Sequence, residues 1–243
     1  MPILADARWT LDAAGRAVLL ASVEALGLEE IGRSTEGRAI GVCRWDAAAG
    51  RAPLVILGGI HGDEPASTAA VVALCAALEQ RRTPLPLPLL IVPAVNPDGL
   101  ARGSKNSARD VDLNRNFPAR NFAPTHEPGY FPGDAPLSEP ETRAVAALVQ
   151  AHGVRGVVAV HAPFACVNYD GPAAAWAEAV ARASGWPARA DIGYPTPGSL
   201  GSWLGVDRGV PVLTLELPAG DFAPFRSRAE AALAAAIDWK WGS

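Results

Sequence analysis

Short apolar runs alternate along this chain with longer segments in which apolar residues recur every three or four positions. The apolar runs have the length and composition of strands that are buried on both faces of a sheet. The longer segments have the periodicity of amphipathic helices. The predicted strands are Leu54–Leu57, Leu87–Val95, Gly156–Val160 and Pro211–Leu217, and the predicted helices are Leu11–Leu26, Ala66–Arg82, Glu139–His152, Ala173–Ser184 and Ser227–Trp241.

The order of these elements indicates the class of fold. Ile31–Trp45 alternates around Glu36 and Gly37 as a β-hairpin does. Strands that alternate with helices are typical of an α/β domain, here with a mixed, mostly parallel sheet and helices on both faces. Asn96–Pro140 has little periodicity and is rich in Pro, Gly, Asn and Asp. Such a long irregular stretch inside a compact domain is usually functional.

Composition narrows the range of partners. The 243 residues are 49% hydrophobic and 19% charged, which predicts a globular chain with a sizeable core. A net charge of -4 argues against nucleic acid as a partner. No apolar run reaches the ~18 residues of a membrane span, and the N-terminus lacks a basic head followed by an apolar run. We expect a cytoplasmic protein with no membrane partner; the sequence indicates no oligomeric state.

The cysteines do not suggest a disulfide framework or a thiolate metal site. Cys43, Cys75 and Cys166 are odd in number and far apart, and no two of them form a C-x-x-C pair. We expect reduced thiols in the core.

Three of the predicted strands end at, or carry close to their ends, a polar residue that can take part in chemistry. These residues are His61, His161 and Glu216. Because ligands of open α/β sheets bind at the carboxyl ends of the strands, we expect the three side chains to converge there.

Their residue types fit a catalytic zinc site. Catalytic zinc takes three protein ligands of nitrogen or carboxylate type and keeps a fourth position open. His61 and Glu64 supply two ligands from one tight turn, and His161 can supply the third. Glu216, in an otherwise apolar strand, can take the proton of the attacking water. Each residue alone also has an ordinary interpretation: a chance H-x-x-E, a histidine at a strand end, or a buried ion-pair partner.

Candidate site residues therefore run from His61 to Glu216. Dividing the chain between them would dismantle the site, so one domain over residues 1–243 is expected. Its expected parts are an N-terminal helix and hairpin over residues 1–52, a catalytic core over 53–218 and a C-terminal helix over 219–243.

Three further motifs occur in a fixed order between the two histidines. They read Asn-Pro-Asp-Gly from Asn96, Val-Asp-Leu-Asn-Arg-Asn-Phe-Pro from Val111, and Ser-Glu-Pro-Glu-Thr from Ser138. With the H-x-x-E turn before them, and His161 and Glu216 after them, these motifs resemble the zinc carboxypeptidase family. The resemblance extends from about Ile31 to Pro218 and implies a zinc carboxypeptidase-like fold.

The resemblance also implies roles at the matching positions. His61, Glu64 and His161 would bind one zinc ion per chain. Asp112 would support His61, since a ligating histidine usually donates its other N–H to a carboxylate or carbonyl. The resemblance implies that Asn114 and Arg115 hold the terminal carboxylate of the substrate and that Tyr194 closes over it, and it agrees with Glu216 as the group that activates the water. An ordinary surface-loop tyrosine is the alternative for Tyr194.

One position departs from the family pattern. The family has an arginine that stabilises the oxyanion nine residues before the asparagine of D-x-N-R, and this chain has Lys105 there. Lysine offers the charge without the planar fork of arginine, so the role stays with Lys105 or passes to Arg102 or Arg109 in the same loop.

Two other segments, His161–Cys166 and Gly193–Trp203, are most similar to a cytoplasmic subgroup of the family, the murein peptide amidases. The resemblance implies hydrolysis of the amide between γ-D-glutamate and meso-diaminopimelate in recycled cell-wall peptides, with a small peptide bearing a free carboxylate as the partner. One alternative is an N-acyl amino acid hydrolase of the succinylglutamate desuccinylase or aspartoacylase kind. Others are a carboxypeptidase of different specificity and a non-catalytic metal-dependent binding module.

Overall fold

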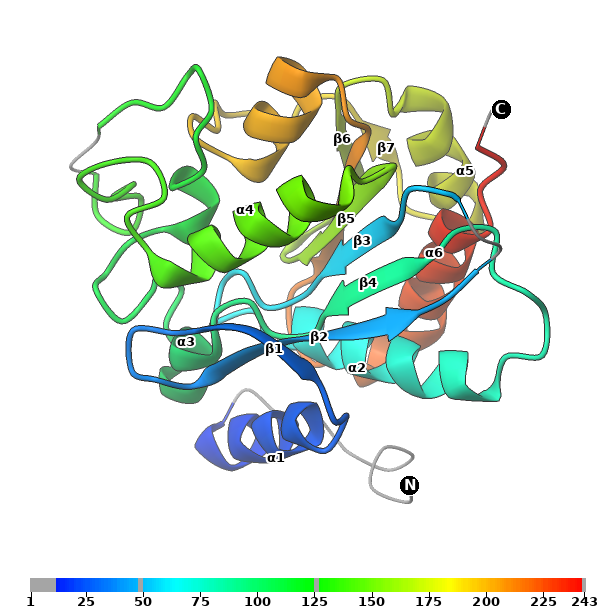
Figure 1. Cartoon of the computed structure of the whole chain (residues 1–243), viewed down its shortest axis with the longest axis horizontal. Coiled ribbons are helices and arrows are strands. Elements are labelled where there is room, and N and C mark those ends of the chain that lie inside the picture. Colours follow the sequence, from blue (N-terminus) through cyan, green and yellow to red (C-terminus); the bar gives the residue numbers. More distant parts are fainter. Residues whose placement is uncertain (1–11, 48–49, 125–126, 242–243) are drawn as a thin grey trace.

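One sheet runs through the part of the chain that the computed structural model describes, residues 12–47, 50–124 and 127–241 (Figure 1). Its strands are β1 (Glu29–Arg33), β2 (Ala39–Trp45), β3 (Leu54–Leu57), β4 (Leu89–Val92), β5 (Gly156–His161), β6 (Phe164–Asp170), β7 (Ala188–Arg189) and β8 (Val212–Pro218). Their order across the sheet is β1-β2-β4-β3-β5-β8-β6-β7.

The centre of the sheet is parallel and its margins are mixed. β4, β3, β5 and β8 are neighbours that run in the same direction. β1 and β2 form the predicted hairpin, whose second strand pairs antiparallel with β4. β6 lies antiparallel to β8. Every residue of β3 and β4 is buried, as their wholly apolar sequences predict.

Helices cover both faces of the sheet, as predicted. The helices are α1 (Ala13–Glu24), α2 (Pro65–Gln80), α3 (Pro97–Arg102), α4 (Pro140–His152), α5 (Ala174–Ser184) and α6 (Arg226–Ile237), with a π-helical segment, η3, at Gly201–Val206. One apolar layer joins α1, α2, α5 and α6 to the sheet. A second layer joins α4 and η3 to the opposite face. Figure 1 shows α4 crossing in front of the sheet, with α2 and α6 behind it.

Several of the described elements were not predicted from the sequence, among them β6 and α3. β6 mixes apolar and polar residues because it pairs near the margin of the sheet, where Asn168 and Asp170 face a pocket. α3 begins the stretch that we expected to be irregular, and the side chain of Asn96 caps it by accepting a hydrogen bond from the backbone N–H of Gly99 at 2.8 Å. Leu11, the first residue of the predicted N-terminal helix, lies outside the described residues.

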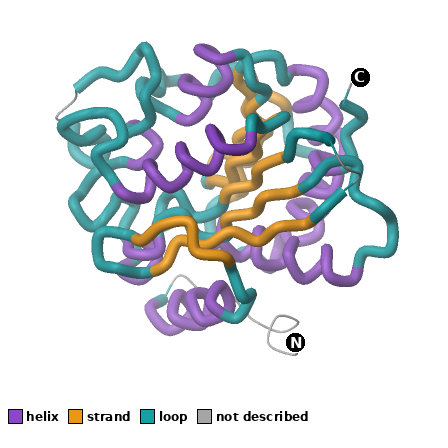
Figure 2. The backbone as a smooth tube through the Cα atoms, viewed as in Figure 1, coloured by secondary structure: helices purple, strands orange, loops and turns teal. Residues whose placement is uncertain are grey.

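The expected division into residues 1–52, 53–218 and 219–243 stays a prediction, although β2 already belongs to the main sheet. Among the described helices, none is long and apolar enough to cross a membrane. Figure 2 shows the long loops, in teal, gathered at the end of the sheet where β3 and β5 finish. The predicted site residues lie at this end.

Candidate active site

The turn after β3 brings the first two predicted metal ligands together. Gly59 adopts a left-handed backbone conformation with φ of 59°, which favours glycine. At Gly62 a Cβ atom would lie 1.9 Å from the carbonyl carbon of Gly99, so only glycine allows α3 to approach this closely. Glu64 follows, with Pro65 opening α2 in the first turn, where its missing N–H costs nothing.

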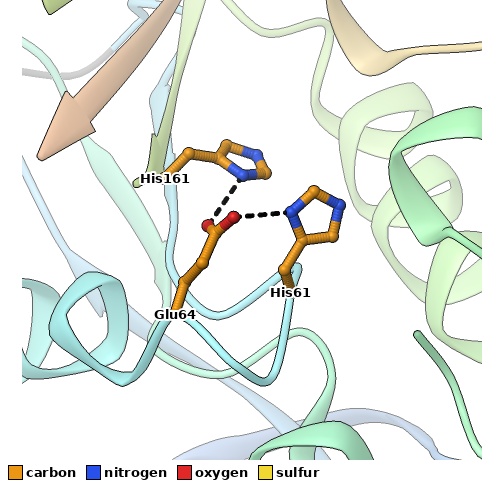
Figure 3. A group of neighbouring side chains, drawn as sticks. All are labelled: His61, Glu64 and His161. Carbon is orange, nitrogen blue, oxygen red and sulfur yellow. Dashed lines mark hydrogen bonds and ion pairs between the residues drawn. The ribbon is translucent and has the colours of Figure 1, made fainter. Parts of the chain in front are cut away.

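His61, Glu64 and His161 form one cluster, with the carboxylate of Glu64 between the two imidazole rings (Figure 3). Glu64 Oε1 lies 2.8 Å from His61 Nδ1, and Glu64 Oε2 lies 3.0 Å from His161 Nδ1. One ligand atom from each residue lies within 4.8 Å of the other two. The backbone N–H of Ala162 also donates to Glu64 Oε2, at 3.1 Å, which fixes the carboxylate.

The hydrogen-bonding pattern around His61 indicates that a cation binds between this histidine and Glu64. Its Nε2 lies 3.0 Å from Oδ1 of Asp112, a fully buried carboxylate, so this nitrogen carries a proton and donates it. The Nδ1 atom of a neutral ring then presents a lone pair to Glu64 Oε1, which is also an acceptor. A metal ion between these two atoms removes the conflict. The donor set of two imidazoles and one carboxylate is a common one for catalytic zinc.

The electrostatics of the cluster agree with this interpretation. Burial alone lowers the pKa of His61, but the carboxylates of Glu64 and Asp112 outweigh it and raise that pKa to about 10. Burial likewise raises the pKa of Glu64, and the two histidines overcome it and lower the value to about 2. The pKa of Asp112 is also lowered, mainly by the hydrogen bond from His61 against the effect of burial. The pocket is thus built to hold positive charge between anionic groups.

Glu216 faces the same pocket from β8, directly across the parallel ladder from His161. Its side chain is buried, and its Oε2 atom has no hydrogen-bond partner among the described residues. Burial raises its pKa, although His161 opposes the shift. A buried carboxylate with a free oxygen beside a metal cluster can act as a general base.

Asn114 and Arg115 line this pocket, a cavity of about 260 Å³. Arg115 is buried and donates to the backbone carbonyl of Asn114, and it forms no ion pair with any carboxylate in the described part of the chain. Oδ1 of Asn114 accepts from the backbone of Leu200, which leaves its amide nitrogen without a described protein partner. A buried guanidinium that forms no ion pair within hydrogen-bond reach, beside a free amide donor, is suited to a carboxylate ligand.

Tyr194 stands at the mouth of the pocket with 38% of its surface exposed. Its ring lies 6.1 Å from that of Phe164, and both Tyr194 and Arg115 line the cavity. Burial raises the pKa of the hydroxyl. Tyr194 therefore faces the same cavity as Arg115.

The three candidate oxyanion cations occupy different places. Lys105 lines the pocket, and its ammonium group donates to Asp112 Oδ2 at 2.7 Å and to the carbonyl of Gly129 at 2.8 Å. Arg102 instead pairs with Glu36, and Arg109 lies 3.8 Å from Glu139, both away from the pocket lining. Lys105 alone of the three faces the site.

The motifs that carry the family resemblance hold the loops of the site in place. The amide nitrogen of Asn116 donates to Pro132, Ala135 and Ser138, and its oxygen accepts from Glu139 and Thr142. Asp98 is fully buried and accepts from Ser34, from Arg38 and from the backbone of Glu36 in the hairpin. The second and third motifs are therefore joined by one asparagine, and the first is tied to the β1–β2 hairpin.

The structure adds pocket residues that the sequence did not single out. Asn168 and Asp170 from β6 and Thr214 from β8 line the same cavity as the metal cluster. The positions of Asn168 and Asp170 depend on β6, which was not predicted. Thr214 lies two residues before Glu216 on one strand, so the two side chains point to the same face of the sheet. This spacing was the only sign in the sequence that Thr214 shares the cavity with Glu216.

The sequence profile of zinc carboxypeptidases matches residues 22–175 of this chain. The chain belongs to the zinc carboxypeptidase family. It is thus a zinc-dependent peptidase or amidase, and an enzyme rather than a binding module. The matched segment includes His61, Glu64 and His161 and ends before Glu216, so the roles of individual residues stay predictions.

Comparison with individual proteins shows which members of the family this chain is similar to. The chain is 38% identical over 204 residues to murein peptide amidase A from Escherichia coli K12, which covers 79% of this chain and 81% of the relative. The crystal structure of the murein-tripeptide amidase from Escherichia coli O157 superposes with a TM-score of 0.71 at 32% identity, over 88% of this chain and 93% of that chain. Carboxypeptidase A from Helicoverpa armigera has a TM-score of 0.74 at 19% identity, over 91% of this chain and 72% of that chain, and shares the fold.

Proposed function

We propose that this zinc enzyme hydrolyses the amide bond between γ-D-glutamate and meso-diaminopimelate in murein peptides. The names of its relatives support this substrate, and the chain matches about four fifths of the length of one of them. The observation that carries the proposal is the unpaired Arg115 guanidinium in the same cavity as the metal cluster. Because this guanidinium pairs with an anionic group, we expect every substrate to carry a free carboxylate next to the scissile bond.

Substrate binding starts at Arg115 and Asn114, which we call the carboxylate clamp. Arg115 and the amide nitrogen of Asn114 hold the carboxylate of the residue that will leave, and Tyr194 covers it. Because the clamp belongs to a rigid loop fixed by Asn116, it sets the distance at which the scissile carbonyl lies from the cluster. A substrate without the carboxylate is not positioned.

Bond cleavage then requires a proton acceptor and a cation. When bound by His61, Glu64 and His161, zinc supplies a Lewis acid that polarises the scissile carbonyl and acidifies water. The free Oε2 of Glu216 accepts the proton of the attacking water and later gives it to the leaving amine. Lys105 supplies fixed positive charge toward the oxygen that becomes anionic. One zinc ion per chain suffices for these steps.

The relatives also favour this function over acyl amino acid hydrolysis, which we weighed as an alternative. The proposal places the enzyme in the cytoplasm, where it acts on cell-wall peptides that are being recycled. Its support is the similarity to the murein peptide amidases over most of both chains.

The proposal is tested with a panel of four substrates. The zinc-loaded protein is incubated with L-Ala-γ-D-Glu-meso-diaminopimelate, the same tripeptide amidated at the carboxylate next to the scissile bond, N-succinylglutamate and a peptide with C-terminal phenylalanine. We expect the free tripeptide to be cut to L-Ala-D-Glu and diaminopimelate, as identified by mass. The amidated tripeptide should not be cut, because the clamp has nothing to hold.

The matched control is Glu216→Gln, which keeps the shape of the side chain and removes the base. It should retain zinc and lose about 10²- to 10⁴-fold in turnover on the same tripeptide. If N-succinylglutamate or the phenylalanine peptide is the best substrate of the four, the murein assignment is wrong. If Glu216→Gln stays within a few-fold of the wild type, Glu216 is not the base.

A further inference from the structure

Two of the three cysteines meet in a second cavity, which shares no lining residue with the cavity of the metal cluster. Cys43 lies on β2 and Cys75 on α2, and both side chains belong to the apolar layer between this helix and the sheet (Figure 1). Both line one cavity of about 330 Å³. We call these two residues the thiol pair.

The members of the thiol pair differ in their access to solvent. Cys43 is partly exposed, and the exposed residues Glu29, Arg44 and Glu79 line the cavity beside it. Cys75 is fully buried. A small oxidant that enters the cavity from solvent therefore reaches the sulfur of Cys43 before that of Cys75.

The two thiols also differ in acidity. The thiol of Cys75 lowers the pKa of Cys43 and outweighs burial and Glu79, which both raise it. The thiol of Cys43, together with burial, raises the pKa of Cys75. Because the thiolate is the nucleophilic form, Cys43 is the sulfur that reacts first, and Cys75 keeps its proton.

This arrangement is typical of a pair that closes a disulfide on oxidation. Oxidation-sensitive cysteines are accessible, have a low pKa and often lie beside a second, resolving cysteine. Cys43 has the first two properties, and Cys75 stands in the place of the resolving thiol. The third cysteine, Cys166, is buried on β6 and does not line this cavity.

We propose that the thiol pair is a site of reversible oxidation, at which hydrogen peroxide joins Cys43 and Cys75 in a disulfide between β2 and α2. The Cys43 thiolate attacks one peroxide oxygen, the O–O bond breaks, and the other oxygen leaves as hydroxide, which takes up a proton to form water. Cys43 is then a sulfenic acid.

The second step closes the bond. The sulfur of Cys75 attacks the sulfur of Cys43, the S–S bond forms and the S–O bond breaks. The hydroxyl group leaves as water with the proton of Cys75. Two thiols have then lost two electrons, and one peroxide has become two molecules of water. The reaction consumes none of the residues to which the proposed hydrolysis gives a role.

The test treats the zinc-loaded, full-length protein with hydrogen peroxide and maps its cysteines by mass. Free thiols are blocked with iodoacetamide in denaturant before digestion with trypsin, which releases Cys43 in residues 39–44, Cys75 in residues 52–81 and Cys166 in residues 156–182. We expect the first two peptides to be joined, at the sum of their masses less two hydrogens. Dithiothreitol should separate them, and Cys166 should carry the label.

Two serine variants separate the roles of the thiol pair. In Cys75→Ser, peroxide should convert Cys43 to a sulfenic acid, which dimedone traps. In Cys43→Ser, the thiol of Cys75 should react at least about 10-fold more slowly than Cys43 does in Cys75→Ser, because it is buried and protonated. The matched control is Cys166→Ser, which should form the same disulfide as the wild type.

The result that would overturn the proposal is read from the wild type and needs no variant to fold. It is oxidation of Cys43 while Cys75 keeps its thiol and takes the label. A disulfide that includes Cys166, or one that joins two chains, would also contradict it. The mapping uses no peptide substrate, so its outcome is independent of the test of the proposed function.

Discussion

The ammonium group of Lys105 is held by three groups at once. It donates to Asp112 and to the carbonyl of Gly129, and it lies 3.8 Å from the centre of the Tyr130 ring. These contacts place a fixed positive charge on the pocket wall. They also connect that charge to His61 through Asp112, so a change at Lys105 can act on the metal cluster as well as on the substrate.

Replacing Lys105 separates these two effects. If the ammonium group stabilises the oxyanion, Lys105→Ala should lower kcat by about 10²- to 10³-fold with little change in KM, because the charge develops only in the transition state. Steady-state kinetics on the tripeptide, with zinc content measured on the same samples, give the answer. Arg109→Ala, which removes the partner of Glu139, is the control and should leave kcat within a few-fold. A rise in KM alone would make Lys105 a ground-state binding residue.

Individual site residues differ in how far the sequence could predict them. The clustering of His61, Glu64 and His161 was predictable because two lie in one turn and the third ends a buried strand. The place of Asp170 in the cavity was not predictable, since it lies on β6 and two glycines of η3 pack beside it. The choice among Lys105, Arg102 and Arg109 depends on the path of an irregular loop, which periodicity does not describe.

At the scale of elements, the site depends on the close approach of α3 to the turn after β3. The backbone N–H of Gly62 donates to the carbonyl of Lys105 at 3.2 Å, and the Asn96 side chain donates to the same carbonyl at 3.3 Å. The turn with His61, the cap of α3 and the loop with Lys105 therefore meet at one point. A side chain at Gly62 has no room there.

Gly62→Ala should disturb this contact. The added Cβ forces the turn and α3 apart, which we expect to lower the free energy of unfolding by about 1–3 kcal/mol, the usual cost of overpacking, and to weaken zinc binding. Denaturant unfolding and zinc titration measure the two effects. Gly153→Ala, at the end of α4, is the control: its φ of 55° makes alanine costly to stability, but a Cβ there meets nothing within 4 Å, so zinc binding should stay intact. A Gly62→Ala protein with wild-type stability and zinc affinity would contradict this explanation.

The elements themselves were mostly predictable. Central strands such as β3 and β5 are apolar throughout because both of their faces are buried. β6 was missed because one of its faces lines the pocket, so its polar residues break the apolar pattern. α3 was missed because it is only six residues long and its sequence, Pro-Asp-Gly, is typical of a turn.

For the molecule as a whole, the fold class followed from the alternation of strands and helices, and the reaction class from the ordered motifs. The mixed sheet brings the carboxyl ends of β3, β5 and β8 together, and Lys105, Asn114 and Arg115 from the stretch between α3 and α4 line the cavity there. Residues more than 150 positions apart in the sequence thus share one cavity. Sequence patterns could not give the shape of that cavity, because long-range packing determines it.

The central claim is that one zinc ion, held by His61, Glu64 and His161, activates this cavity for hydrolysis. The most direct test removes the metal with a chelator and returns zinc stepwise while cleavage of L-Ala-γ-D-Glu-meso-diaminopimelate is followed. We expect activity to disappear on chelation and to rise linearly to a sharp end point at about one equivalent of zinc per chain. His161→Ala should show no such end point. Full activity after chelation, or an end point that His161→Ala shares with the wild type, would contradict the account.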